Sequence, residues 1–204
     1  GHGQGVETTV AWFDVYDPLT NSWEILPNAP HPRDHAQLVE AGGKLYLVGG
    51  RIGGTEGDFF SATVPEVDVY DPLTNSWNSL PPELNLPTPR GGVAAARLGQ
   101  RVVVAGGESG QPDAHAEVEA FHTNHQVWET LPSLVQQRHG TGMVSIGESL
   151  YIVAGSGSKG GTPELNSAEI FTDDVNPVNP MKSIVPGTLE FSPATLSFGS
   201  VPAG

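Results

Sequence analysis

Internal repetition is the feature that most constrains how this chain can fold. A ten-residue segment, Asp-Val-Tyr-Asp-Pro-Leu-Thr-Asn-Ser-Trp, occurs twice, at residues 14–23 and 68–77. A degenerate third copy runs from Phe121 to Trp128 and keeps the spacing between the aromatic residue and the tryptophan. Phe171 occupies the corresponding place in a fourth unit, which lacks the tryptophan. A repeat of roughly 50 residues predicts an array of similar units that bury their apolar faces against one another.

A second repeated pattern lies between these segments. An arginine precedes a pair of small residues by 16 positions in three units: Arg33 and Gly49-Gly50, Arg90 and Gly106-Gly107, and Arg138 and Ala154-Gly155. Short apolar runs separated by turn residues predict four strands per unit and no helix. In the second unit we expect strands at 35–39, 44–48, 66–70 and 76–80. The sequence therefore predicts an all-β fold of four-stranded antiparallel sheets.

The distribution of side-chain size favours a radial arrangement of these sheets. The first strand of a unit is rich in small residues, as at 91–96 and 140–142. The large aromatic residues belong to the third and fourth strands: Tyr16, Tyr70, Trp23, Trp77 and Trp128. Small residues suit the crowded centre of a propeller and large ones its periphery. A stacked solenoid stays open as an alternative.

These motifs resemble those of the kelch repeat, over roughly residues 1–172. The resemblance implies a partial kelch β-propeller of four-stranded antiparallel blades, about three to four in this chain. The fourth unit departs from the motif at Ala154 and after Phe171. From the spacing of Gly1 to Tyr16 we expect the chain to begin inside a blade, with further blades upstream. The outer strand of the fourth blade is expected either at 181–185 or from an N-terminal strand of the intact protein.

Composition predicts three regions. Residues 1–175 hold the kelch repeats, and residues 176–186 form a proline-rich linker. Residues 187–204 alternate apolar and polar side chains and resemble the first strands of hydin-like, choice-of-anchor-type immunoglobulin-like domains. Because eighteen residues cannot bury a core, we expect this domain to continue beyond Gly204 and its start to be loosely packed or docked as an extra strand. The resemblance implies an extracellular or cell-surface location.

Several classes of function are excluded by composition. The chain has no cysteine, which excludes disulfides, cysteine-ligated metals and a cysteine nucleophile. Its net charge of −14 disfavours nucleic acid, and no apolar run is long enough for membrane insertion. The histidines show no metal-ligand spacing, so we expect them at the surface and predict no metal and no cofactor. The chain also lacks a phosphate-binding loop and a serine nucleophile elbow.

The three repeated arginines allow two interpretations. Each could hold backbone carbonyls or a carboxylate of the next blade, which is the interpretation we favour. Alternatively, Arg33, Arg90 and Arg138 could form a ring of guanidinium groups at the mouth of the central channel and bind carboxylates. In kelch propellers that bind acidic peptides, an arginine at this position contacts the ligand, so the resemblance implies the same here.

The loops between the second and third strands are the other candidate sites, because variable loops on a rigid scaffold often carry function. Phe59 and Phe60 lie in one such glycine-rich loop, either as a contact patch or as cover for an adjacent blade. The candidate binding residues are Arg33, Arg90, Arg138, Arg51, Phe59, Phe60, His35 and His139.

The sequence as a whole favours a non-catalytic binding or scaffold module that recognises a protein or a glycan. The alternative is a fragment of a kelch-propeller enzyme, of the carbohydrate oxidase or sugar epimerase type. The oxidase requires a cysteine-crosslinked tyrosine, which this chain cannot supply. In that alternative the catalytic residues lie outside residues 1–204.

Overall fold

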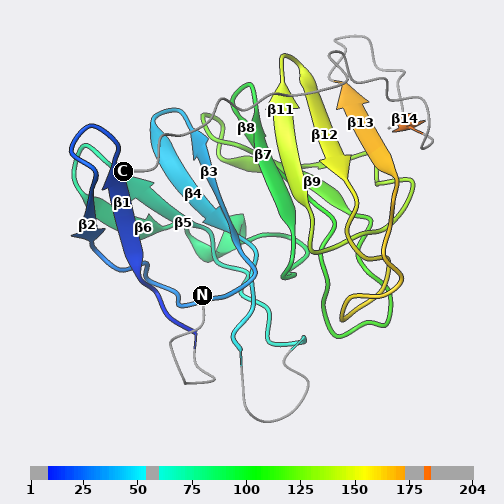
Figure 1. The fold of residues 1–204 in the computed structure, drawn as a ribbon. Coiled ribbons are helices and arrows are strands. Elements are labelled where there is room, and N and C mark those ends of the chain that lie inside the picture. The colour runs from blue at the N-terminus through cyan, green and yellow to red at the C-terminus, as the bar shows by residue number, and fades with distance from the viewer. Residues whose placement is uncertain (1–8, 54–59, 173–181, 185–204) are drawn as a thin grey trace, which may run out of the picture.

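The structure, a computed structural model, describes residues 9–53, 60–172 and 182–184. Figure 1 shows four antiparallel sheets side by side, which we call blades one to four. Blade one has β1 (Phe13–Asp17) and β2 (Ser22–Leu26). Blade two has β3 (Gln37–Ala41), β4 (Lys44–Val48), β5 (Asp68–Asp71) and β6 (Ser76–Ser79). Blade three has β7 (Ala94–Leu98), β8 (Arg101–Ala105), β9 (Val118–His122) and β10 (Val127–Leu131).

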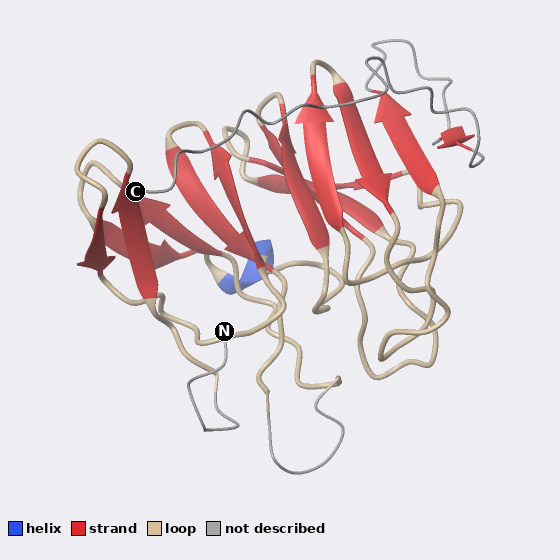
Figure 2. Cartoon of the chain, viewed as in Figure 1, coloured by secondary structure: helices blue, strands red, loops and turns tan. Residues whose placement is uncertain are grey.

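Blade four has β11 (Gly142–Ile146), β12 (Ser149–Val153), β13 (Ala168–Thr172) and β14 (Lys182–Ile184). In the three complete blades each strand pairs with the next one in sequence. Within the described residues the single helix is the short 3₁₀ turn η1 (Pro82–Leu84), drawn in blue in Figure 2. The predicted all-β fold of four-stranded blades is confirmed. The described part of the chain also holds no helix with the length and hydrophobicity that a bilayer crossing requires.

The inner strand of blade two begins two residues later than the sequence predicts. His35 has a φ of 55°, in the left-handed region, and Asp34 forms an isolated bridge with Arg51. The chain therefore turns before it enters β3. Gly92 and Gly140 take the same conformation at the corresponding places, with φ of 62° and 61°.

These turns also join the blades. The Gly92 amide donates to the His35 carbonyl at 2.8 Å, and the Gly140 amide donates to the Gly92 carbonyl at 2.9 Å. Strand β7 contacts both β3 and β11, so the inner strands of successive blades are neighbours. This hydrogen-bonded inner edge is the hub that a propeller requires.

The hydrophobic core lies between blades, in two clusters on either side of blade three. Strand β8 contributes to both, because alternate side chains of a strand face opposite sides. Val102 and Val104 pack with Val39 and Val69 of blade two. On the other side, Val103 belongs to the cluster formed with the residues Met143, Leu150 and Ile152 of blade four.

The repeated aromatic residues of blades two and three pack in the outer part of their blades, as predicted from side-chain size, whereas Tyr16 and Trp23 of blade one are 42% and 70% exposed. Within blade two the ring centroids of Tyr70 and Trp77 are 5.3 Å apart, and Phe13 of blade one lies 4.9 Å from Tyr70. The indole N–H of Trp77 donates to the Pro27 carbonyl at 2.8 Å. Trp128 makes the equivalent bond to Leu84 at 2.8 Å. Each tryptophan thus anchors its outer strand to the connection that precedes the blade.

Strand β14 completes blade four. It pairs antiparallel to β13, with Ile184 opposite Ala168 and Lys182 opposite Ile170. The outer strand expected at 181–185 is therefore present, and an N-terminal strand does not take that place. Residues 182–184 form a strand inside the range expected to be a linker. The rest of the expected linker at 176–186 lies outside the described residues. The expected start of an immunoglobulin-like domain at 187–204 also lies outside them.

Candidate binding face

The three repeated arginines are buried inside their own blades. Their exposed fractions are 4% for Arg33 and 0% for Arg90 and Arg138. Arg33 donates to the carbonyls of Gly49 at 3.0 Å and Glu66 at 2.8 Å, and to the Asp68 carboxylate at 2.7 Å. Desolvation by burial lowers the pKa of Arg33, and Asp68 opposes that shift.

The other two blades repeat this arrangement. Arg90 pairs with Glu119 at 2.5 Å and Arg138 with Glu169 at 2.7 Å. Each arginine also donates to the small residue 16 positions later, Gly106 at 2.6 Å and Ala154 at 2.8 Å. The carboxylate comes from the same blade, on its third strand, and not from the next blade. The arginines thus lie in the blade interior, where they tie three strands together.

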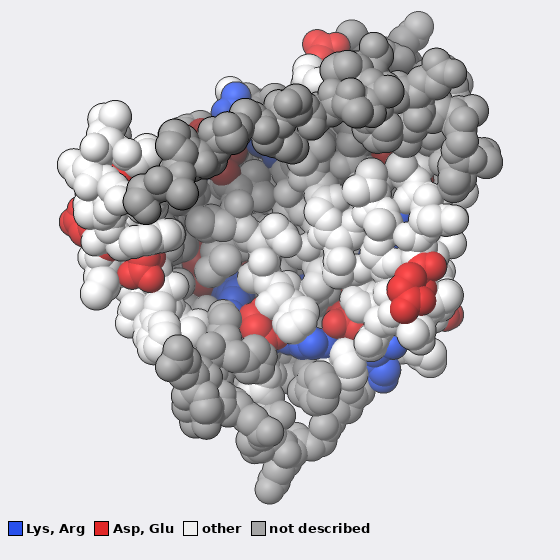
Figure 3. All heavy atoms as spheres, viewed as in Figure 1, with Lys and Arg blue, Asp and Glu red and all other residues white. Residues whose placement is uncertain are grey.

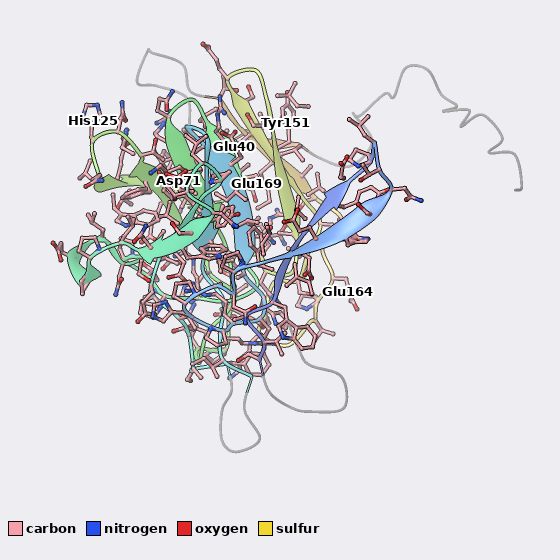
Figure 4. The ribbon with its side chains drawn as sticks, turned by 90° about the vertical axis from the view of Figure 1, so that its left-hand side faces the viewer. Glu40, Asp71, His125, Tyr151, Glu164 and Glu169 are labelled. Carbon is pink, nitrogen blue, oxygen red and sulfur yellow. The ribbon has the colours of Figure 1, made fainter. Side chains whose placement is uncertain are left out.

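The long connections between second and third strands gather at one end of the molecule, which we call the loop face. They lie at the lower edge of Figure 1. In Figure 4, Glu164 of the β12–β13 loop lies at this end, and Glu40 and His125 lie at the other, near the hairpin turns. The repeated up-and-down strand order places all three loops on the same face.

An ion-pair network links these loops across three blades. Arg51 of blade two donates to Glu108 of blade three at 2.8 Å. The second oxygen of Glu108 lies 3.5 Å from Nδ1 of His139 and accepts the Gly160 amide of blade four at 3.0 Å. Arg51 also lies 3.4 Å from the Asp34 carboxylate. Figure 3 shows acidic and basic atoms side by side toward the loop end of this view.

Arg51 and Glu108 occupy equivalent positions, directly after the small-residue pair of their blades. Their opposite charges therefore meet between neighbouring blades. Both are buried, with exposed fractions of 7% and 2%. His35 lies beside them, with its Nε2 atom 3.3 Å from Arg51. The structure thus brings together Arg51, His35 and His139 of the predicted residues and adds Glu108.

Phe60 covers this network. Its ring centroid lies 4.6 Å from the guanidinium carbon of Arg51 and 5.3 Å from the Lys159 ammonium. The ring of a blade-two loop therefore reaches the blade-four loop, as expected if it covers neighbouring blades. Phe59 lies outside the described residues.

Replacing Phe60 with leucine is expected to lower the free energy of unfolding by about 1 kcal/mol. Leucine keeps apolar cover over Arg51 but removes the aromatic face that attracts the two cations. Urea denaturation of Phe60→Leu beside the parent chain measures the difference. If Phe60→Leu and the parent chain unfolded at the same urea concentration, with the same dependence of the free energy on urea, this role of the ring would be contradicted.

The histidines do not all lie at the surface, contrary to the sequence-based expectation. His139 and His115 are buried, and each ring has a hydrogen-bonding partner inside the loop face that offsets the cost of its burial. His125 is exposed at the tip of the β9–β10 turn (Figure 4). Within the described ranges, no group of three or more histidine or acidic side chains is arranged to hold a metal ion.

A radial set of four-stranded blades with loops linked at one end defines a kelch-type β-propeller. The chain matches the KLHDC2/KLHL20/DRC7 Kelch-repeats domain over residues 3–155 and again over 35–188, and it belongs to this family.

Sequence relatives are kelch proteins from animals and fungi. Kelch domain-containing protein 8B of Rattus norvegicus is 29% identical over 148 residues, covering 72% of this chain and 42% of the relative. Kelch-like protein terF of Aspergillus terreus is 30% identical over 160 residues, covering 76% and 33%. The chain thus spans less than half the length of these curated relatives.

A solved structure confirms the fold independently. The structure titled "Structure of YjhT" superimposes with a TM-score of 0.65 at 19% identity, covering 86% of this chain and 52% of that one. At this identity the likeness concerns the fold alone.

Proposed function

We propose that this chain is a protein-interaction module whose ligand binds at the loop face. The observation that carries the proposal is the linkage of loops from three blades into one surface. Besides the Arg51–Glu108 pair, the Lys159 amide donates to Pro112 at 3.0 Å and the Ala114 amide to Gly157 at 3.1 Å. A surface ordered before binding loses little conformational entropy when a ligand arrives.

The charge and apolar character of this face favour a neutral or basic polypeptide segment. The repeated arginines are buried in ion pairs, and the net charge of −14 repels acidic ligands. Ile52, which follows Arg51, is 52% exposed and offers an apolar anchor in the same loop as Phe60. A glycan ligand and an extracellular or cell-surface location, implied by the resemblance of residues 187–204, remain predictions.

Exchange of Ile52 for aspartate is expected to weaken binding by roughly tenfold or more, because a charge replaces an apolar anchor at the interface centre. The probes are a peptide array and a glycan array incubated with the purified chain, followed by titration of the strongest binder. Leu73→Asp is the matched control, since Leu73 is 94% exposed in the β5–β6 turn at the opposite end.

Binding to peptides that is lost in Ile52→Asp and kept in Leu73→Asp would support the proposal. Binding to glycans alone would replace the polypeptide with a carbohydrate ligand. Equal loss in both variants, or a loss only in Leu73→Asp, would contradict the assignment to the loop face.

A further inference from the structure

A three-residue hydrogen-bonded chain lies in the β8–β9 loop of blade three. The Ser109 hydroxyl lies 2.8 Å from Nε2 of His115. Nδ1 of the same ring lies 3.0 Å from a carboxylate oxygen of Glu117. That oxygen also accepts the Ala116 amide at 3.1 Å, which fixes its position. Serine, imidazole and carboxylate are thus aligned through both ring nitrogens.

The chemistry of the carboxylate sets the direction of these bonds. Partial burial raises the pKa of Glu117, but its own backbone N–H, the His115 ring and the charge of Arg90 together lower it by more. An ionised carboxylate can only accept, so Nδ1 of His115 carries the proton. Burial lowers the pKa of His115, the charge of Arg90 adds to this effect, and Glu117 and Glu119 oppose it. Because the net shift takes the pKa below 6.5, the neutral ring predominates at pH 7. The lone pair of Nε2 therefore accepts the Ser109 hydroxyl proton.

The neighbouring blades show that the fold does not require a histidine at this place. The backbone amides of Val64, His115 and Leu165 each donate to the second residue of their small-residue pair, at 2.9, 2.7 and 2.8 Å. They are therefore equivalent positions, and the other two blades fill them with apolar side chains. By the same register, Ser109 corresponds to Ile52 and Gly157.

The serine end of this hydrogen-bonded chain reaches the surface. Ser109 is half-buried and is followed by exposed residues 110–113. A hollow of about 430 Å³ borders Glu117, with walls from residues 111–114 of that loop and from Ser133 and Gln137; Ser109 and His115 do not line it. Lys159 donates to the Gly110 carbonyl at 3.2 Å, which places a positive charge beside the peptide that follows Ser109.

We propose that Ser109 is an activated nucleophile, with His115 as its general base and Glu117 as the residue that positions the ring, and that it accepts acyl groups from small neutral or cationic carboxylic esters. The serine oxygen attacks the ester carbonyl carbon while its proton passes to Nε2. The bond to the alcohol breaks, the leaving alkoxide takes that proton, and the acyl group remains on Ser109. Water then attacks this acyl group while Nε2 takes a proton from it; the bond between the acyl carbon and the Ser109 oxygen breaks, that oxygen takes the proton back from Nε2, and the carboxylic acid is released.

The test uses a fluorophosphonate probe on the intact chain, with the site and rate of labelling followed by mass spectrometry. The serine oxygen displaces fluoride from phosphorus, so the label stays on the nucleophile. Labelling is expected at Ser109 and absent in Ser109→Ala. In His115→Val the rate is expected to fall about 100-fold or more, because a general base contributes this much. Valine is the natural residue at the same place in blade two, so this variant is expected to fold.

Two further variants and a pH series separate a nucleophile from a structural hydrogen bond. Glu117→Gln is expected to slow labelling by at least roughly tenfold at an unchanged unfolding midpoint, because the ring loses its fixed tautomer. Ser133→Ala, at the wall of the hollow, is expected to leave the rate unchanged. The rate should fall as the pH drops through the pKa of His115, below the ordinary value of 6.5. Ser109 left unlabelled, labelled no faster than Ser133, or labelled equally in His115→Val would overturn the proposal.

Discussion

Replacing Arg90 with alanine is expected to lower the free energy of unfolding by about 3–5 kcal/mol, the cost of leaving a buried charge without its partner. Arg90 is fully buried and bonds the Glu119 carboxylate at 2.5 Å. It also donates to four backbone carbonyls, including those of Gly106 and Thr88 at 2.6 Å. Chemical denaturation of Arg90→Ala measures the loss. A change below 1 kcal/mol would mean that the arginine is not a structural tie of the blade.

Arg97 supplies the matched control, because it forms an ion pair of similar length in solvent. Its guanidinium lies 2.8 Å from Glu40, and the two side chains are 48% and 50% exposed. Arg97→Ala is therefore expected to cost less than about 1 kcal/mol. The double variant Arg90→Met with Glu119→Leu should recover part of the loss of Arg90→Ala, since it removes both buried charges together.

Replacing Gly106 with alanine is expected to cost about 3 kcal/mol, through backbone strain and overpacking. Gly106 has a φ of 62°, and a Cβ placed there would lie 2.2 Å from the Arg138 carbonyl oxygen of the next blade. Gly99→Ala isolates the strain, because φ is 59° there with no atom within 4 Å of the added Cβ. Thermal or urea unfolding of both variants separates the two costs. Equal destabilisation by both would show that blades three and four do not approach as closely as described.

The repeats made most of the fold predictable from the sequence. The copies of the Tyr-to-Trp segment marked the third and fourth strands, and the alternating apolar residues marked the first two. Ala154 stands where the repeat motif has glycine. It takes a left-handed φ of 55°, as Gly49 and Gly106 do at the equivalent positions. Strand ends were less predictable, because the turn at His35 depends on a bridge between Asp34 and Arg51.

The direction of side chains could not be predicted from spacing alone. Arg33, Arg90 and Arg138 have the same separation from the small-residue pair whether they point into the blade or into a channel. Their carboxylate partners are an aspartate and two glutamates, Asp68, Glu119 and Glu169, which share no letter pattern. The network between blades did have a signal in the sequence. The residues directly after two of the small-residue pairs, Arg51 and Glu108, carry opposite charges.

The Ser109–His115–Glu117 chain gave no recognisable sequence pattern, because it lies in an irregular loop without a nucleophile elbow. The His115 amide donates to the Gly107 carbonyl, and this bond fixes the path of the loop. That path brings the three residues together. A local comparison of the repeats does distinguish it, since the same register places Val64 and Leu165 in the other blades. The prediction of no catalytic residue in this chain rested on known motifs and is put to the test by the labelling experiment.

Amide hydrogen exchange measured by NMR tests most directly that the blades are joined around a common inner edge. The amides of Gly50, Gly92, Gly107 and Gly140 donate across blade boundaries at 2.8–2.9 Å. The account predicts that these four exchange as slowly as the amides of the buried strand β8. Exchange as fast as that of the exposed β5–β6 turn, with β8 still protected, would show that each blade folds without its neighbours and would contradict the propeller arrangement.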